Sequence, residues 1–253
     1  MIQDQLFMTY IKGANQPFQG WDFSWITGTG RLNSEPLSWS YGSMAIAHIQ
    51  KADSLLDMGT GGGEFLSMLR PLPPKTAATE GYLPNLPVAK ERLEPLGVQV
   101  MQVKDDDRLP FADGQFDLIL NKHESFSPKE VRRIIAERGI FLTQQVGGED
   151  CNGLNEKLGL PIPTDYSNWK LETAVRQLEE NGFRVLSAKE EFPTQRFYDV
   201  GALIYFLRAI PWQAPDFDVE RQMEALYQIH QEMQSEGFLA IRQHRFIILA
   251  KAM

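Results

Sequence analysis

The residues best suited to chemistry lie in one glycine-rich turn, Asp57-Met-Gly59-Thr-Gly61-Gly-Gly63-Glu64. The turn follows a short apolar run over residues 54–58, which predicts a strand, and it precedes a predicted helix over residues 64–70. Because glycine has no Cβ, such a turn lets the backbone approach a ligand closely. The segment therefore predicts a binding site for a ligand of the nucleotide type.

The acidic residues of this turn limit which nucleotide it can bind. A dinucleotide-binding turn follows the pattern G-x-G-x-x-G, and its third glycine would stand where this chain has Glu64. A carboxylate there complements the helix dipole but repels a pyrophosphate. No Gly-Lys-Ser/Thr follows, so the turn is not a P-loop either. S-adenosylmethionine (SAM) has a nucleoside, a sulfonium cation and an amino acid but no phosphate, and it fits Asp57 and Glu64 better than NAD does.

Two further acidic positions follow predicted strands. Glu80 ends the predicted strand over residues 75–79, where a carboxylate can accept hydrogen bonds from both hydroxyls of a ribose. Asp105 follows the predicted strand over residues 98–103, where an acid can accept from an adenine amino group. Each position has an alternative explanation. NAD enzymes also have an acidic residue at the position of Glu80, and Asp105 lies in a run of charged residues that can simply be exposed to solvent.

Taken in order, these stretches resemble the class I SAM-dependent methyltransferases, in particular the type 11 group with its D-x-G-x-G-x-G loop. The pattern Leu109-Pro-Phe111 followed by Phe116-Asp117 belongs to the same resemblance, which covers about residues 50–146. The resemblance implies an α/β, Rossmann-like fold. Its seven-stranded, mostly parallel sheet has an antiparallel last strand and helices on both faces.

The resemblance also implies roles for individual residues around the cofactor SAM. Four residues line its methionine end, namely Asp57, Gly59, Gly61 and Gly63. Five residues lie near its ribose and adenine, namely Glu80, Gly81, Tyr82, Asp105 and the backbone of Asp106. The segment that contains Asn121 runs beneath the methionine and towards the substrate.

The rest of the chain supplies the elements that position these residues. Strands alternate with helices from residue 42 onward, which predicts a mostly parallel sheet covered on both faces. Further strands are predicted over residues 116–120, 139–146, 183–192 and 238–252, the last of them single or a hairpin. We expect a single domain over residues 1–253. Its parts are an aromatic N-terminal arm or lid (1–41), a SAM-binding core (42–146), an insertion (147–167) and the second half of the sheet (168–253).

The catalytic candidates follow the fourth predicted strand. His123 is the best general base on its ordinary pKa, and Glu124 can orient it or act itself. The alternative is a loop whose polar groups only satisfy the backbone. Gln144 or Gln145 can contact the substrate or bond within the sheet, and Arg196 can recognise an acidic substrate.

Composition excludes several classes of protein. The net charge of −8 and the absence of a dense Lys/Arg run argue against a nucleic-acid partner. One cysteine and four scattered histidines offer neither a disulfide nor the spacing of a zinc site, so no metal is expected. No run of 18 apolar residues and no signal-peptide pattern occur, which predicts a cytoplasmic protein without a membrane partner.

The lead hypothesis is a SAM-dependent methyltransferase that acts on a small molecule. The alternatives are an RNA or protein methyltransferase of the same fold, and a non-catalytic SAM-binding regulatory protein. An NAD-type oxidoreductase is disfavoured by Glu64. The sequence predicts neither the acceptor atom nor the oligomeric state, since fold alone does not choose a substrate.

Overall fold

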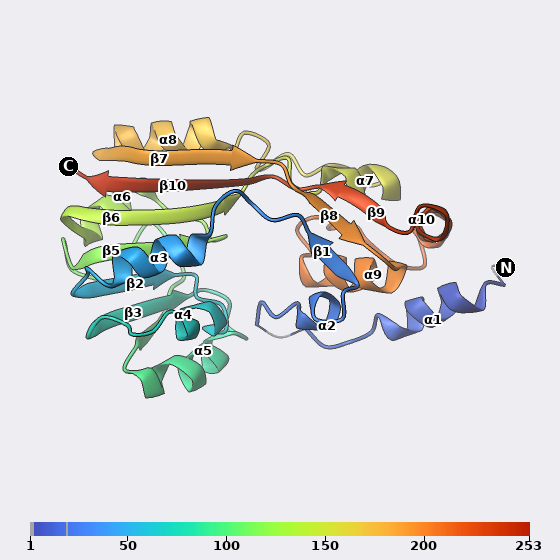
Figure 1. The fold of residues 1–253 in the computed structure, drawn as a ribbon, viewed down its shortest axis with the longest axis horizontal. Helices are drawn as coiled ribbons and strands as arrows, with labels where there is room; N and C mark the ends of the chain where they lie inside the picture. The colour runs from blue at the N-terminus through green and yellow to red at the C-terminus, as the bar shows by residue number, and fades with distance from the viewer. Residues whose placement is uncertain (1–2, 19) are drawn as a thin grey trace.

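The larger sheet of the protein is built from parallel strands with one reversed strand. In the computed structural model, which describes residues 3–18 and 20–253, this sheet has seven strands in the order β4-β3-β2-β5-β6-β10-β7 (Figure 1). Its strands in chain order are β2 (Ser54–Met58), β3 (Lys75–Glu80), β4 (Gln99–Gln102), β5 (Phe116–Lys122), β6 (Ile135–Val146), β7 (Phe183–Glu191) and β10 (Arg245–Ala252). Only β10 runs antiparallel to its neighbours, β6 and β7. The predicted fold class is therefore confirmed.

Apolar side chains bury both faces of this sheet. All five residues of β2 are buried, which explains why its apolar run shows no alternation. One face packs against α3 (Tyr41–Ile49), α4 (Glu64–Met68) and α5 (Leu86–Leu93), with the short 3₁₀ helix Glu94–Leu96 after α5. The other face packs against α6 (Pro128–Ile134) and α8 (Leu171–Glu180).

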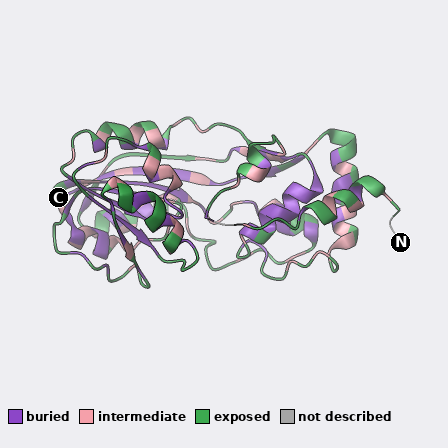
Figure 2. Cartoon of the chain, turned by 90° about the horizontal axis from the view of Figure 1, so that it is seen from below, coloured by how far each residue is buried: buried purple, intermediate pink, exposed green. Residues whose placement is uncertain are grey.

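A second, smaller sheet forms the core of another lobe. Strands β1 (Leu32–Ser34), β8 (Thr194–Phe197) and β9 (Leu239–Arg242) pair antiparallel in the order β1-β8-β9. Around them lie α1 (Gln5–Gly13), α2 (Ser24–Thr27), α7 (Asn152–Leu158), α9 (Val200–Ala209) and α10 (Met223–Glu236). Nine of the ten residues of α9 are buried, so this apolar helix is the centre of the lobe. Figure 2 shows buried residues in both lobes.

The two lobes share continuous stretches of chain. Strand β7 leads into β8, and β9 leads into β10, so each stretch belongs to both sheets in turn (Figure 1). The prediction of a single strand or a hairpin over residues 238–252 is therefore wrong. These residues form two strands in different sheets, β9 and β10, which are separated at Gln243 and His244. At the break, the N–H of Gln243 donates a hydrogen bond to the carbonyl of Pro193. This bond joins the two stretches of chain at the point where each passes from one sheet to the other.

The N-terminal arm contacts both lobes, as far as its residues are described; residues 1, 2 and 19 lie outside that part. Arg31 donates two hydrogen bonds to the carboxylate of Asp199, at 2.7 and 2.6 Å. Asp199 also caps α9, since its side chain accepts from the Ala202 N–H at 2.9 Å. This one carboxylate therefore begins α9 and also fixes the arm.

The parallel strands point their carboxyl ends towards the smaller lobe (Figure 1). In α/β sheets, ligands bind outside these ends. None of the helices in the described residues is long and apolar enough to cross a membrane.

Candidate cofactor and acceptor site

A cavity lies at the carboxyl ends of β2, β3, β4 and β5. Its volume is about 170 Å³, and its lining comes from Met58, Gly59, Thr79, Gly81, Val103, Lys104, Asp105, Asp106 and Glu124. Five of these residues were predicted from the sequence as cofactor-binding or catalytic. The structure thus brings four separate segments of the chain to one hollow.

The glycine turn has a backbone that other residues do not readily adopt. Gly59 and Gly61 have φ values of +66° and +63°, in the left-handed region that favours glycine. A Cβ on Gly61 would lie 2.6 Å from Cδ1 of Trp21, a residue of the N-terminal arm. Trp21 also packs edge-on against Trp212 of the smaller lobe, with ring centroids 5.5 Å apart. The arm and the smaller lobe therefore cover the turn from outside the sheet.

Four carboxyl groups in and beside this cavity have raised pKa values. Burial, with Glu80 nearby, raises the pKa of Asp57 to about 6. Burial, with Asp106 and Glu80 nearby, raises the pKa of Glu124 to about 7. The pKa values of Glu80 and Asp106 are also raised, first by burial and then by neighbouring acids. We call Asp57, Glu80, Asp106 and Glu124 the acid ring; their mutual repulsion favours a cation among them.

The predicted ribose and adenine residues are held by the backbone around them. Glu80 accepts a hydrogen bond from the Tyr82 N–H at 2.6 Å, and backbone N–H groups of Gly61 and Gly81 also favour its ionised form and lower its pKa. Asp106 accepts from the hydroxyl of Ser125, and Asp105 accepts from the Asp107 N–H at 2.9 Å. The side chain of Tyr82 is exposed beside Gly81 at the rim.

Glu64 does not face the cavity as an isolated charge. It forms an ion pair with Arg92, which also donates to the Gly62 carbonyl. Both side chains are about one-third exposed, so the pair is screened by water. The argument against a pyrophosphate therefore rests on the acid ring more than on Glu64.

Asn121 supports the loop that follows β5. Its side chain is fully buried, and its Oδ1 accepts from Thr143 at 2.8 Å and from Gln145 at 2.6 Å. Gln145 also donates to the Glu124 carbonyl at 2.9 Å. The side chain of Asn121 therefore forms hydrogen bonds within the protein, and Gln145 belongs to the same hydrogen-bond network.

His123 is held in one protonation state by two neighbours. The indole N–H of Trp39 donates to Oε1 of Gln144 at 2.8 Å, which fixes the orientation of that amide. The NH₂ group of Gln144 then lies 2.9 Å from Nε2 of His123. Because an amide NH₂ can only donate, Nε2 must accept, and the ring proton sits on Nδ1.

The environment of His123 agrees with a neutral ring. The residue is accessible to water. The surrounding protein nevertheless desolvates the ring, and this lowers its pKa well below the ordinary value. The positive charges of Lys122 and Arg245 lower the pKa further. Its φ of +61° is uncommon for a residue with a Cβ, and such backbone strain often marks functional sites.

Lys122, the last residue of β5, lies near Asp57, and the sequence analysis did not single it out. Its ammonium lies 5.2 Å from the ring centre of Phe65 in α4. Burial lowers the pKa of this amine, whereas the nearby Asp57 raises it and Arg245 lowers it. A single polar residue after a buried strand was the signal that could have found it.

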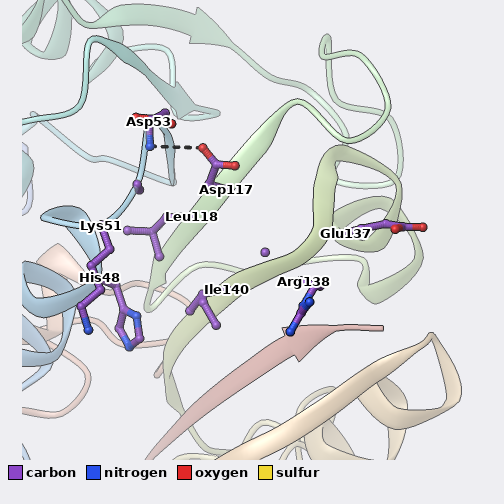
Figure 3. Close-up of a pocket in the computed structure, with 10 residues that line it drawn as sticks. His48, Lys51, Asp53, Asp117, Leu118, Glu137, Arg138 and Ile140 are labelled. Atoms are coloured by element: carbon purple, nitrogen blue, oxygen red, sulfur yellow. Dashed lines mark hydrogen bonds between the residues drawn. The ribbon is translucent and has the colours of Figure 1, made fainter.

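Two other charged features serve structure. Arg196 pairs with Glu35 at 2.9 Å on the smaller sheet, so the structure does not bring it to the cavity. A second hollow of about 230 Å³ lies at the amino ends of the strands, with Asp117 among its lining (Figure 3). There Asp117 accepts from the N–H groups of Asp53 and Ser54, at 3.2 and 3.0 Å, and so joins two strand starts. No group of three or more metal-ligating side chains occurs among the residues the structure describes.

Comparison with known proteins agrees with the glycine turn and the sheet. Residues 56–142 match the family model described as a methyltransferase domain. Among curated proteins, none matches the chain closely enough to count as a relative. The central part of the chain therefore matches a methyltransferase domain, and the predicted resemblance to the class I SAM-dependent methyltransferases is confirmed.

Solved structures share the fold at low sequence identity. The candidate methyltransferase BH2331 of Bacillus halodurans C-125 is 20% identical, with a TM-score of 0.59 over 82% of this chain and 96% of that one. YcgJ of Bacillus subtilis is 16% identical, with a TM-score of 0.58 over 84% and 97%. The [4+2]-cyclase SpnF is 18% identical, with a TM-score of 0.51 over 96% and 90%. One fold thus carries more than one chemistry, and the site residues must decide.

The bonds around His123 predict a neutral ring with its proton on Nδ1 at pH 7. Two-dimensional ¹⁵N NMR of the imidazole nitrogens measures this directly. Trp39→Phe or Gln144→Leu should release Nε2 and move the pKa of His123 up, towards about 6.5. The matched control is Trp169→Phe, which removes a similar indole bond to the neighbouring Gln145 (3.3 Å). A proton on Nε2 in the wild type would contradict the assignment.

Proposed function

We propose that the protein is a SAM-dependent methyltransferase whose acceptor is a small molecule. The acid ring carries the proposal, because four carboxyl groups with raised pKa values lie close to the glycine turn, and two of them, Asp106 and Glu124, line the cavity. A sulfonium cation relieves their repulsion, whereas the phosphates of NAD or a nucleic acid add to it. The methyltransferase domain over residues 56–142 supports the same conclusion.

The residues present fit this cofactor. Asp57 and the turn of Gly59, Gly61 and Gly63 would hold its methionine end. Glu80, whose carboxylate is oriented by the Tyr82 N–H, would hold the ribose, with Gly81 and Tyr82 beside it. Asp105 and the backbone of Asp106 would meet the adenine.

When bound, SAM supplies an electrophilic methyl group on a sulfonium. Glu124 would act as the general base, because a pKa of about 7 leaves it ionised for about half of the molecules at neutral pH. It takes the proton that the acceptor atom loses as the methyl group is transferred. His123 would donate from Nδ1–H to the acceptor, since its Nε2 lone pair is already used by Gln144. Trp21 and Trp212 would exclude water from the outer side.

Calorimetric titration with SAM, S-adenosylhomocysteine and NAD tests the proposed cofactor. We expect the first two to bind and NAD not to bind. Gly61→Arg should abolish binding, because its side chain fills the turn against Trp21. Gly30→Arg is the matched control, since Gly30 also has a positive φ but has open space around its Cβ position. Binding of NAD alone, or of none of the three, would refute the proposal.

Glu124→Gln should lower the rate of methyl transfer by about 100-fold or more, because it removes the base. Its affinity for S-adenosylhomocysteine, which lacks the sulfonium charge, should stay nearly unchanged. The rate is measured as formation of S-adenosylhomocysteine with an acceptor found by screening, and Glu137→Gln at the far edge of the sheet is the control. The wild-type rate should fall as the pH drops below about 7, because Glu124 is then protonated. An unchanged rate in the variant would remove Glu124 from the mechanism.

A further inference from the structure

Two consecutive glutamines near the end of β6 reach the loop that follows β5. The amide NH₂ group of Gln144 lies 2.9 Å from Nε2 of His123, and that of Gln145 donates to the backbone carbonyl of Glu124 at 2.9 Å. Both glutamine side chains are buried. Because consecutive residues of a strand point to opposite faces of the sheet, the two amides hold the two catalytic candidates from opposite faces.

A tryptophan orients each of these amides. The indole N–H of Trp39 donates to Oε1 of Gln144 at 2.8 Å, and that of Trp169 donates to Oε1 of Gln145 at 3.3 Å. Trp39 packs on the face of the sheet that α3, α4 and α5 cover, whereas Trp169 packs on the face that α6 and α8 cover. Because an indole N–H can only donate, the atom that faces it must be the amide oxygen. We call each indole with its amide a Trp–Gln clamp.

The loop between β5 and α6 depends on contacts of this kind. Residues 123–127 contain neither helix nor strand. His123 has a φ of +61°, and such a conformation persists only where the surroundings fix it. Glu124 lies against the glycine turn, since a Cβ on Gly59 would stand 2.6 Å from its Oε2. A small movement of the loop would therefore displace this carboxyl group from the cavity that it lines.

The orientation of the Gln145 amide decides whether the loop is held. Its NH₂ group donates to Oδ1 of Asn121 at 2.6 Å as well as to the Glu124 carbonyl. A reversed amide would place its oxygen against both of these acceptors and would repel them. The indole N–H of Trp169 opposes this reversal, because it needs an acceptor. Trp169 thus influences Glu124 without lining the cavity itself.

We propose that Trp169 is a positioning residue, which acts through Gln145 to hold Glu124 in the cavity. This inference rests on the proposed function, in which Glu124 is the general base. Trp39 acts on His123 in the same way from the other face of the sheet. Trp39 precedes α3 and Trp169 precedes α8, so each clamp also ties the loop to a segment outside the sheet.

NMR titrations test the clamps without any substrate. The ¹³C signal of the Glu124 carboxyl group is identified by its loss in Glu124→Gln. Trp169→Phe, which keeps a ring against Phe126, should move the pKa of Glu124 down from about 7, because the loosened loop lets water reach its carboxyl group. It should leave the pKa of His123 unchanged. Trp39→Phe should do the reverse.

The rate of methyl transfer gives a second readout. Trp169→Phe and Gln145→Met should lower kcat by about 10-fold and leave the affinity for S-adenosylhomocysteine within about 2-fold. They should also move the acidic limb of the kcat–pH profile to lower pH, because this limb follows the pKa of Glu124. Trp25→Phe is the matched control, since its ring lies over Arg31 in the smaller lobe, and it should change neither readout.

A lower melting temperature of Trp169→Phe with an unchanged pKa of Glu124 would show that the indole only supports the fold, and it would overturn the inference. An unchanged kcat and pH profile would overturn it too. If Gln145→Met does not fold, Trp169→Phe decides alone. The expected pKa shifts in a wild-type background that neither binds SAM nor transfers a methyl group would support the clamp and refute the proposed function instead.

Discussion

The burial of the four carboxyl groups of the acid ring, with other acids nearby, is the constraint on which the site depends. Asp57 lies on the buried strand β2, Glu80 accepts from the Tyr82 N–H, and Asp106 accepts from the Ser125 hydroxyl. Their raised pKa values mean that the folded protein binds protons more tightly than the unfolded chain does. For Asp57 and Glu124, this contribution to stability falls as the pH rises from about 4 to about 7. A cation bound among them restores the lost stability.

The rest of the molecule can be understood as the support for that arrangement. Parallel strands buried on both faces bring Asp57, Glu80 and Glu124 to one edge of the sheet, although they are far apart in sequence. The smaller lobe is connected to the larger sheet at that same edge, where β7 leads into β8 and β9 leads into β10. The N-terminal arm is held to this lobe by the hydrogen bonds between Arg31 and Asp199. Trp21 then lies against the glycine turn. A cover from outside lowers the local dielectric, which strengthens every charge interaction beneath it.

Local patterns predicted much of this from the sequence. The glycine turn, the acids after the strands and the alternation of strands with helices depend on neighbouring residues, and they were found in the right order. The division of residues 238–252 between two sheets was not found, because the break depends on Pro193, which lies about fifty residues away. The state of His123 depends on Trp39 and Gln144, which are 105 residues apart in the chain. Lys122 looked like a strand end, since its environment is made by Phe65 and Asp57 on other elements.

Proton release on SAM binding tests the acid ring most directly. Titrations at pH 6.5 in buffers with different heats of ionisation count the protons released. At this pH Glu124, with a pKa of about 7, is mostly protonated, and Asp57, with a pKa of about 6, is partly so. A cation lowers both pKa values, so SAM should release up to about one proton, and S-adenosylhomocysteine, which lacks the sulfonium, should release less. Equal release by the two ligands, or none with either, would show that the carboxyl groups do not respond to the sulfonium charge.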